Sequence, residues 1–495
     1  MKKLHIHISI FLLALGSLSS SCTKWLDLKP QDGLVEQDFW QTKEHVRSAV
    51  NGLYISLTSG NLVSSLFMHG EIRTNMVELS AFTTQVLDEY RFANLMSANT
   101  LTNWGEYYRI INLCNNVIDN APKAKEMDPT FSQEDLDAYI GEALTIRAWM
   151  NFYLARIWGD VPLKLTFTQS DDDNLMIPKS TQAQVFEAVV ADLTRAGGMV
   201  KETFGGSVAM DKGKITKNTV NALLADVYLW QNDYEKALAA CDVIIQSGKF
   251  QLVPGAASTW LNTLFAEGNS VEGIFELQYD RQQLNPFHVL FRQNPTYLVG
   301  NNVYESLYMI DESNPENFDV RGDRGSLDAS SGQIYKYQGI NRELRKTLEE
   351  SYTHWMVYRY ADVLLMKAEA LNELSRGQEA LDLIYEIRER ANALSFNDLN
   401  PSPSDPESIT TFLLEERARE FAYEGKRWFD VLRFARRDNY ARLDFITNMV
   451  TEYAPVDRQQ SMLGKYRDPN SHYLPIYFTE LQMNKALIQN PFYTN

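Results

Sequence analysis

Apolar residues recur every three or four positions over much of this chain, which is the period of a helix with one buried face. The pattern predicts four helices, over residues 142–158, 183–196, 413–423 and 428–436. The first should end at Trp158, because Gly159 can adopt the left-handed cap conformation and Pro162 cannot continue a helix. The chain is therefore expected to be mostly α-helical.

A second helical signal occurs twice within the chain. In both copies a small residue, Ala225 or Ala368, precedes a larger apolar residue by three positions. A second Ala follows nine positions after that larger residue. This spacing is typical of tetratricopeptide repeats, in which small residues lie where two antiparallel helices cross and large ones fill the groove to the next pair. We expect a scaffold of helix pairs, an α-superhelix, mainly over residues 135–250 and 355–440.

Three other segments have a different character. Residues 60–130, 250–354 and 440–495 are mainly loop-like, with Gly, Ser, Asn, Pro and Tyr between short apolar runs, of which residues 273–279 resemble a β-strand. Long insertions on a rigid scaffold commonly carry ligand contacts, although such loops also serve as plain connections. The scaffold is therefore expected to support a largely irregular, ligand-binding half with a few short strands.

The N-terminus has the organisation of an export signal. Two lysines are followed by an apolar run over residues 8–18, which is too short to span a bilayer, and then by three serines and Cys22. Small residues before a Cys resemble a lipoprotein processing site, in which the thiol receives the lipid. We expect residues 1–21 to be a lipoprotein signal peptide, residues 22–495 the mature chain and Cys22 the lipid attachment site. A plain signal peptide with an incidental Cys is the alternative.

Composition narrows the function classes further. The chain has 44% hydrophobic and 22% charged residues, which fits a globular protein. Its net charge of −17 disfavours nucleic acid as a partner, because the phosphate backbone would be repelled. The remaining cysteines, Cys114 and Cys241, stand among apolar neighbours and are expected to be buried free thiols.

Sequence motifs of the common enzyme classes are absent. The chain has no phosphate-binding Gly-rich loop, no Gly-x-Ser-x-Gly elbow and no His-Glu-x-x-His pair, so we expect no cofactor, no catalytic metal and no enzymatic activity. Paired carboxylates have no sequence signature, which leaves a secreted helical glycoside hydrolase as an alternative. The three aspartates at residues 171–173 suggest either calcium binding or, more simply, a solvated loop. A pure scaffold lipoprotein without a small ligand is a further alternative.

Several motifs follow one another along nearly the whole mature chain. They include Trp104-Gly-Glu-Tyr-Tyr108, Trp158-Gly-Asp-Val-Pro-Leu163, Arg359-Tyr-Ala-Asp-Val-Leu-Leu365, Glu415-Glu-Arg-Ala-Arg-Glu420 and Glu424-Gly-Lys-Arg-Trp-Phe-Asp430. In this order and spacing they resemble the SusD/RagB family of nutrient-uptake lipoproteins. The resemblance implies a lipid-anchored protein on the surface of the outer membrane of Bacteroidota. Such a protein binds a glycan, or a peptide in RagB-type branches, and caps a SusC-like TonB-dependent transporter.

The charged residues of the last two motifs have a structural interpretation. They lie three or four positions apart on predicted helices, which suits an ion-pair network that ties the last helices to the repeats. The alternative is that they contact a ligand. These residues are Glu420, Glu424, Arg427, Asp430 and Arg433.

Candidate ligand contacts lie in the irregular segments, where the resemblance places them. Arg73 offers a planar fork of donors, and Asn75 offers both a donor and an acceptor, as sugar hydroxyls and peptide groups require. Alternatively, Arg73 pairs with Glu71 at the surface, and the aromatic residues belong to the core. The full set of predicted ligand contacts is Glu71, Arg73, Asn75, Phe82, Tyr90, Phe92, Phe291, Tyr297 and Tyr304.

Overall fold

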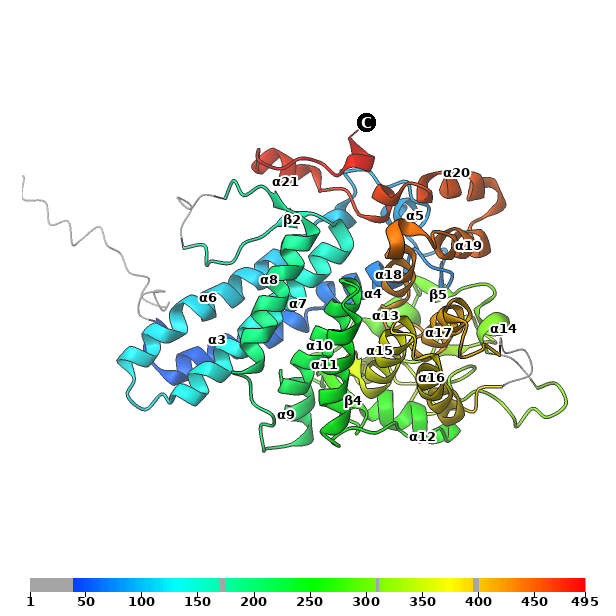
Figure 1. Ribbon diagram of the computed structural model, residues 1–495, viewed down its shortest axis with the longest axis horizontal. Coiled ribbons are helices and arrows are strands. Elements are labelled where there is room, and N and C mark those ends of the chain that lie inside the picture. Colours follow the sequence, from blue (N-terminus) through cyan, green and yellow to red (C-terminus); the bar gives the residue numbers. More distant parts are fainter. Residues whose placement is uncertain (1–38, 170–174, 309–310, 395–399, 495) are drawn as a thin grey trace, which may run out of the picture.

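The computed structural model describes residues 39–169, 175–308, 311–394 and 400–494. Helices dominate, which confirms the predicted fold class (Figure 1). The ten longest helices are α3 (Lys43–Leu57), α6 (Gly105–Met127), α7 (Gln133–Trp158), α8 (Gln182–Gly197), α10 (Lys217–Trp230), α11 (Tyr234–Gln246), α15 (Tyr360–Glu373), α16 (Gly377–Ala391), α17 (Pro406–Glu420) and α18 (Arg427–Tyr440), together with the shorter α4 (Gly60–Glu71).

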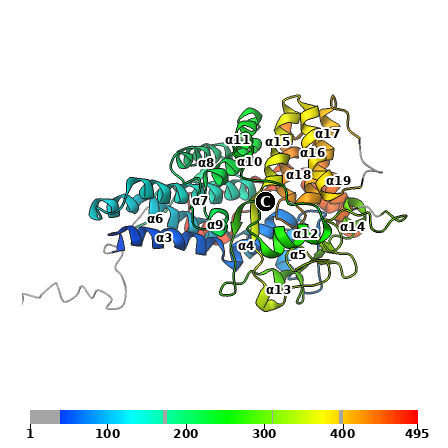
Figure 2. The ribbon, with the colours of Figure 1, turned by 90° about the horizontal axis from the view of Figure 1, so that it is seen from below.

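These helices pack as antiparallel neighbours in chain order, as the repeat pattern predicts. Helix α10 packs against α11 and α15 against α16, and α11 also packs against α15, which joins the two pairs. The four alanines of the repeats, Ala225, Ala237, Ala368 and Ala380, are fully buried. Figure 2 shows the paired helices as one layer from α8 to α17, with α3, α4 and the shorter elements on the other side.

Local sequence explains where several helices begin and end. Helix α8 starts at a capping box, in which Thr181 and Gln184 satisfy each other's backbone amides. Asp405 caps α17 and Pro406 occupies its first position. Helix α7 ends at Trp158, as the sequence predicts, and Gly159 has a positive φ of 77°, although its ψ of −113° lies outside the predicted left-handed cap conformation.

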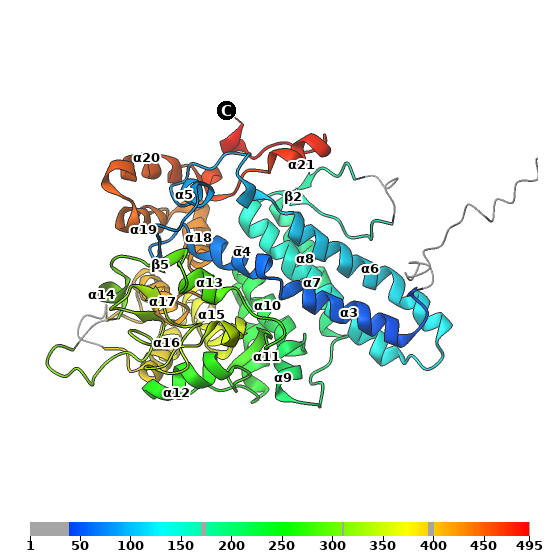
Figure 3. The ribbon, with the colours of Figure 1, turned by 180° about the vertical axis from the view of Figure 1, so that it is seen from behind.

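The other side of the molecule contains short helices and four two-stranded antiparallel sheets. The sheets pair β1 (Val77–Leu79) with β5 (Tyr297–Val299), β2 (Val161–Pro162) with β3 (Lys179–Ser180), β4 (Gly273–Leu277) with β8 (Trp355–Arg359), and β6 (Leu327–Asp328) with β7 (Gln333–Ile334). The remaining α-helices are α5 (Gln85–Arg91), α9 (Val208–Gly213), α12 (Ala257–Leu261), α13 (Phe287–Phe291), α14 (Val303–Leu307), α19 (Asp444–Tyr453), α20 (Val456–Tyr466) and α21 (Phe478–Met483). Figure 3 shows α12, α13 and α14 on this side, with α13 next to β5 and α12 at the lower edge.

The segment over residues 60–130 is more helical than we expected. It forms α4, α5 and the 23-residue helix α6. In α6, Tyr107, Ile110, Cys114 and Val117 recur every three or four positions and are buried against α3 and α7. The asparagines and the Pro between them conceal this period in the sequence. The irregular part is therefore concentrated in residues 250–354.

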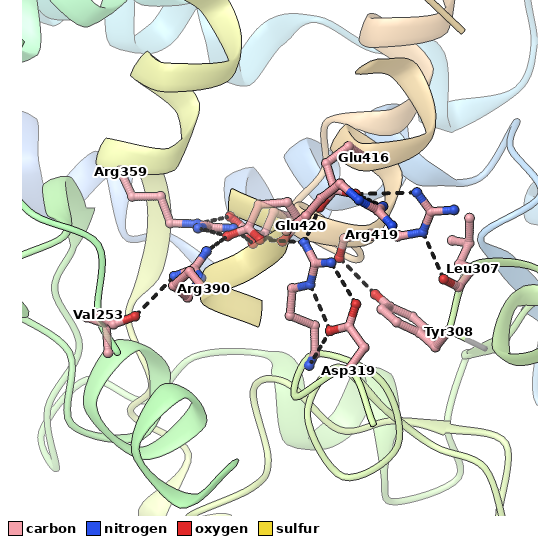
Figure 4. A network of polar contacts seen from close by, with 12 residues as sticks. Val253, Leu307, Tyr308, Asp319, Arg359, Arg390, Glu416, Arg419 and Glu420 are labelled. Carbon is pink, nitrogen blue, oxygen red and sulfur yellow. Dashed lines mark hydrogen bonds and ion pairs between the residues drawn. The ribbon is translucent and has the colours of Figure 1, made fainter. Parts of the chain in front are cut away.

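A network of buried ion pairs joins the helical layer to the irregular part (Figure 4). Arg359, at the end of β8, donates to Glu272, which directly precedes β4, at 2.6 Å and to Glu420 of α17 at 2.5 Å. Arg321, in the loop between α14 and β6, contacts Glu420 at 2.8 Å and Glu416 at 2.5 Å. All of these side chains are fully buried.

The predicted ion-pair network is confirmed, with one exception. Glu424 pairs with Arg359 and Lys336, and Arg433 bridges Glu369 and Asp430. Arg427 instead donates to the carbonyl of Leu414, and it forms no ion pair with any described residue.

Two further observations concern the described residues. No helix among them has the length and hydropathy that a bilayer-spanning segment requires. Cys114 and Cys241 are buried free thiols, as predicted.

The ion-pair network yields a stability prediction. Glu420→Gln removes the charge that compensates the buried guanidinium groups of Arg321, Arg359 and Arg390, so we expect the free energy of unfolding to fall by roughly 3–5 kcal/mol. Glu415→Gln is the matched control, because its side chain is 42% exposed and pairs only with Arg419 at 3.4 Å; it should cost less than about 1 kcal/mol. Chemical denaturation of both variants measures the difference. If both variants lose an equally small free energy of unfolding, the buried arginines do not require the charge of Glu420.

Candidate functional site

Most of the predicted ligand contacts lie in the protein interior. Glu71, Arg73, Tyr90, Phe291 and Tyr297 are each at most 3% exposed. Phe291 and Tyr297 pack against Phe67 with ring centroids 4.8 Å and 5.0 Å away. A ligand at the surface cannot reach these side chains in this conformation, so we assign them to the core.

Arg73 connects the end of α4 to the C-terminal part of the chain. Its Nη1 donates to the carbonyl of His472 at 2.8 Å, and its guanidinium lies 3.9 Å from the ring of Trp428. The donor fork that suggested a ligand contact is thus held among aromatic rings. The alternative of a surface pair with Glu71 does not hold either, because both residues are buried and no ion pair joins them.

Glu71 has a structural role at the same helix end. Its Oε1 accepts hydrogen bonds from the backbone amides of Gly425 and Lys426, at 2.8 and 3.3 Å. Burial raises the pKa of Glu71 to about 8, although these two hydrogen bonds act in the opposite direction. Helix α4 can approach the backbone at Gly425 this closely only because residue 70 is Gly. A Cβ at that position would lie 1.9 Å from the carbonyl oxygen of Gly425.

The other predicted contacts are more accessible but do not form one site. Asn75 is half-buried and donates to Glu452 at 2.7 Å. Phe82 is 58% exposed, and Phe92 lies 4.2 Å beneath the guanidinium of Arg458. Tyr304, from the predicted set, lines a large pocket.

That pocket, which we call the Arg342 pocket, is a cavity of about 560 Å³ in the irregular part. This volume is within the range of small-ligand sites, roughly 300–1,000 Å³. Tyr304 comes from α14, and the other walls come from the loops that follow α14 and β7. The lining residues are Tyr304, Tyr308, Asp311, Pro315, Glu316, Asn317, Phe318, Asp319, Gly322, Asp323 and Arg342.

Arg342 retains hydrogen-bonding capacity inside this pocket. Its guanidinium lies 4.2 Å from the ring of Phe318, and its Nη1 is buried without a hydrogen-bond partner among the described residues. Burial lowers the pKa of Arg342, while the nearby Asp323 and Tyr304 act to raise it. Because a buried N–H without an acceptor is costly, this nitrogen is suited to bind an acceptor from a ligand.

The four carboxylates of the pocket differ in how they are held. Asp319 is bound by two nitrogens of Arg321, at 2.9 and 2.6 Å. Asp311 accepts hydrogen bonds from Ser313 and Asn317, which lower its pKa. The two remaining acids have capacity for a ligand. Asp323 accepts a single hydrogen bond, from the Ala329 amide at 2.8 Å, and Glu316 is exposed.

Sequence reasoning located the segment of this pocket but missed most of its residues. Residues 250–352 stood out for their Tyr, Pro and Gly content, and Tyr304 was selected from them. Arg342, Phe318 and Asp323 carry no spacing that distinguishes them from other loop residues. A planar cation and an aromatic ring 24 positions apart meet only through the fold.

A second cavity, of about 550 Å³, is less suited to a polar ligand. It lies between the start of α6, the loop after β2 and α21, and most of its walls are aliphatic or aromatic side chains, including Trp104, Leu175 and Met483. Among the described residues, no cluster of three or more His, Cys, Asp or Glu could hold a metal ion. The aspartates at 171–173 lie outside the described residues.

Glu71 yields a prediction for the pH dependence of stability. Because its pKa in the folded state is about 8, against 4.5 as the reference value, its contribution is present below pH 4.5 and is lost as the pH rises to about 8. Glu71→Gln keeps the acceptor for both amides, so the variant should melt higher than the wild type at pH 9. Its melting temperature should also fall less between pH 5 and 8. Parallel profiles for the two proteins would contradict the raised pKa.

Comparisons with known proteins agree with the motifs and the fold. The model of the SusD family matches residues 296–493, and a model described as "Starch-binding associating with outer membrane" matches residues 24–229. A SusD-like protein, P38, from Formosa agariphila is 28% identical over 472 residues, which cover 86% of this chain and 90% of that protein. A SusD-like protein from Bacteroides ovatus is 25% identical, over 93% of this chain and 90% of that protein.

Solved structures show the same architecture. A SusD superfamily protein from Bacteroides vulgatus aligns with a TM-score of 0.75 at 21% identity, over 92% of this chain and 100% of that chain. The surface glycan-binding protein A from Bacteroides uniformis aligns with a TM-score of 0.71 at 21% identity, over 91% of this chain and 100% of that chain. These structures show the shared fold, while the two family models together match residues 24–229 and 296–493, so the chain belongs to the SusD/RagB family.

Proposed function

We propose that this protein is a non-catalytic lipoprotein of the outer-membrane surface, which captures a saccharide in the Arg342 pocket and delivers it to a SusC-like TonB-dependent transporter. The observation that carries the choice of site is the buried Nη1 of Arg342, which has no hydrogen-bond partner among the described residues and lines a cavity of about 560 Å³. Family membership supports the binding role, and the description of one family model supports an association with the outer membrane.

The groups in the pocket match the chemistry of a sugar. A hydroxyl can accept from the Nη1 of Arg342 and donate to a carboxylate such as Asp323, since it has both a proton and lone pairs. The half-buried ring of Tyr304 offers an apolar face for the C–H groups of a sugar ring. Asp319, in the same pocket wall, is held by Arg321 without a ligand.

A peptide ligand, as in RagB-type proteins, is the second candidate. The observation in its favour is the number of carboxylates in the pocket, because they would accept hydrogen bonds from the cationic side chains or the amino terminus of a peptide. The aromatic rings would serve either ligand. Binding measurements with both classes separate the two candidates.

The pocket assignment predicts the effect of one substitution. Arg342→Gln removes a charged donor, so affinity for the bound saccharide should fall about ten- to hundredfold, as the loss of a charged hydrogen bond of roughly 1.5–3 kcal/mol implies. The melting temperature should stay within about 2 °C of the wild type. Arg458→Gln is the matched control, because Arg458 also lies over an aromatic ring but outside the pocket. Calorimetric titration of both variants checks this; equal affinities would place the site elsewhere.

The proposed anchor predicts the behaviour of a cysteine variant. Cys22 lies outside the described residues, and its lipid is expected from the sequence alone. A Cys22→Ala precursor should carry no lipid, be absent from the outer membrane and fail to co-purify with a large β-barrel after mild detergent extraction. Cys241→Ala, which changes a buried thiol, should keep all three properties. Mass spectrometry that finds no lipid on the wild-type residue 22 would contradict the proposal.

A further inference from the structure

The Arg342 pocket contains more negative than positive groups, and this excess limits which ligands of the proposed function can bind there. Asp319 is neutralised by Arg321, at 2.9 and 2.6 Å. The guanidinium of Arg342 then shares the pocket with the three carboxylates of Asp311, Glu316 and Asp323. The hydrogen bonds that lower the pKa of Asp311 keep that carboxyl group ionised at neutral pH. The pocket is therefore negative as a whole, although the Nη1 donor that is buried without a partner among the described residues belongs to a cation.

The positions of Arg342 and Asp323 leave both groups open to a ligand. Asp323 is near enough to act on the pKa of Arg342, and the two groups act in opposite directions on the pKa of Tyr304. No ion pair within 4 Å joins Arg342 to Asp323 or to any other described residue. A donor and an acceptor that are close but unpaired can be bridged by a group that both accepts and donates.

Hydroxyl groups satisfy this requirement, and carboxylate or sulfate groups do not. A neutral saccharide can place one hydroxyl on the Nη1 of Arg342 and an adjacent hydroxyl on the free oxygen of Asp323. A uronate or sulfate could pair with Arg342, but it would face the carboxylates of Asp311, Glu316 and Asp323, and like charges in a partly buried site repel.

We infer that the Arg342 pocket selects neutral saccharides with adjacent free hydroxyls over uronic or sulfated ones, and that Asp323 is a specificity-determining residue. The inference rests on the proposed function, because it names the class of saccharide for the same pocket. The net charge of the whole chain acts in the same direction at longer range, since it is −17.

Matched pairs of oligosaccharides test the inference. The full mature lipoprotein in detergent is titrated with a mannan oligosaccharide and its mannuronate counterpart, and with a galactan oligosaccharide and its galacturonate counterpart. We expect the neutral member of at least one pair to bind ten times or more tightly than its anionic counterpart at low salt. This ratio should decrease as salt is added, because screening weakens the repulsion of the anionic member.

Substitutions then assign the selectivity to named residues. Asp323→Asn keeps the oxygen that accepts the hydrogen bond of the Ala329 amide but removes the charge. Affinity for the neutral ligand should therefore fall several-fold, and the ratio of neutral to anionic affinity should fall about tenfold. Adding Glu316→Gln should reduce the ratio further. Asp457→Asn, which changes an exposed carboxylate outside the pocket, should leave the ratio unchanged. Melting temperatures of all variants show whether they are folded.

The outcomes separate this inference from the proposed function. If anionic members bind as tightly as neutral ones or more tightly, and Arg342→Gln still abolishes binding, the saccharide class is wrong while the pocket stands. If Asp323→Asn leaves the ratio unchanged, Asp323 is not the specificity determinant. If no saccharide binds and a cationic peptide does, the proposed saccharide function itself is overturned.

Discussion

The mutual compensation of buried charges around Glu420 is the constraint on which the rest of this structure depends. Burial opposes the ionisation of Glu420, but Arg390, Arg359 and Arg321 outweigh it and hold the pKa of this carboxyl well below its usual range. The arginines in turn belong to α16, to the end of β8 and to the loop before β6. Because each buried charge is tolerated only with its partners in place, the network fixes the irregular part against the helical layer.

The same network supports the pocket. Asp319 lines the Arg342 pocket and binds Arg321, which contacts Glu416 and Glu420 at the centre of the network. Tyr308, also in the pocket wall, donates to the carbonyl of Arg419 at 2.8 Å. The loop between α14 and β6, which carries Asp323, is therefore attached to α17. Contacts that hold a binding loop before the ligand arrives reduce the entropy cost of binding.

Features that depend on local sequence could be predicted, and features that depend on distant contacts could not. The spacing of residues within one or two helices predicts helix α7, its end before Gly159 and the buried alanines of the repeats. The charged residues of α17 and α18 could also be assigned to ion pairs, because their spacing places them on helical faces. Arg73 and Glu71, by contrast, resemble surface ligand contacts until Trp428 and Gly425, more than 350 positions away, cover them.

Contacts of this kind have a consequence for how the chain reaches its native state. The hydrogen bond from Arg73 to the carbonyl of His472 spans 399 positions, and that from Asn490 to the carbonyl of Trp158 spans 332. The first helices cannot complete their packing until the last residues are available, so contacts of high sequence separation make native folding slow and late. Export, which the proposed function requires, would benefit from this order, because the N-terminal part could not complete its native packing before the C-terminal residues had crossed the membrane.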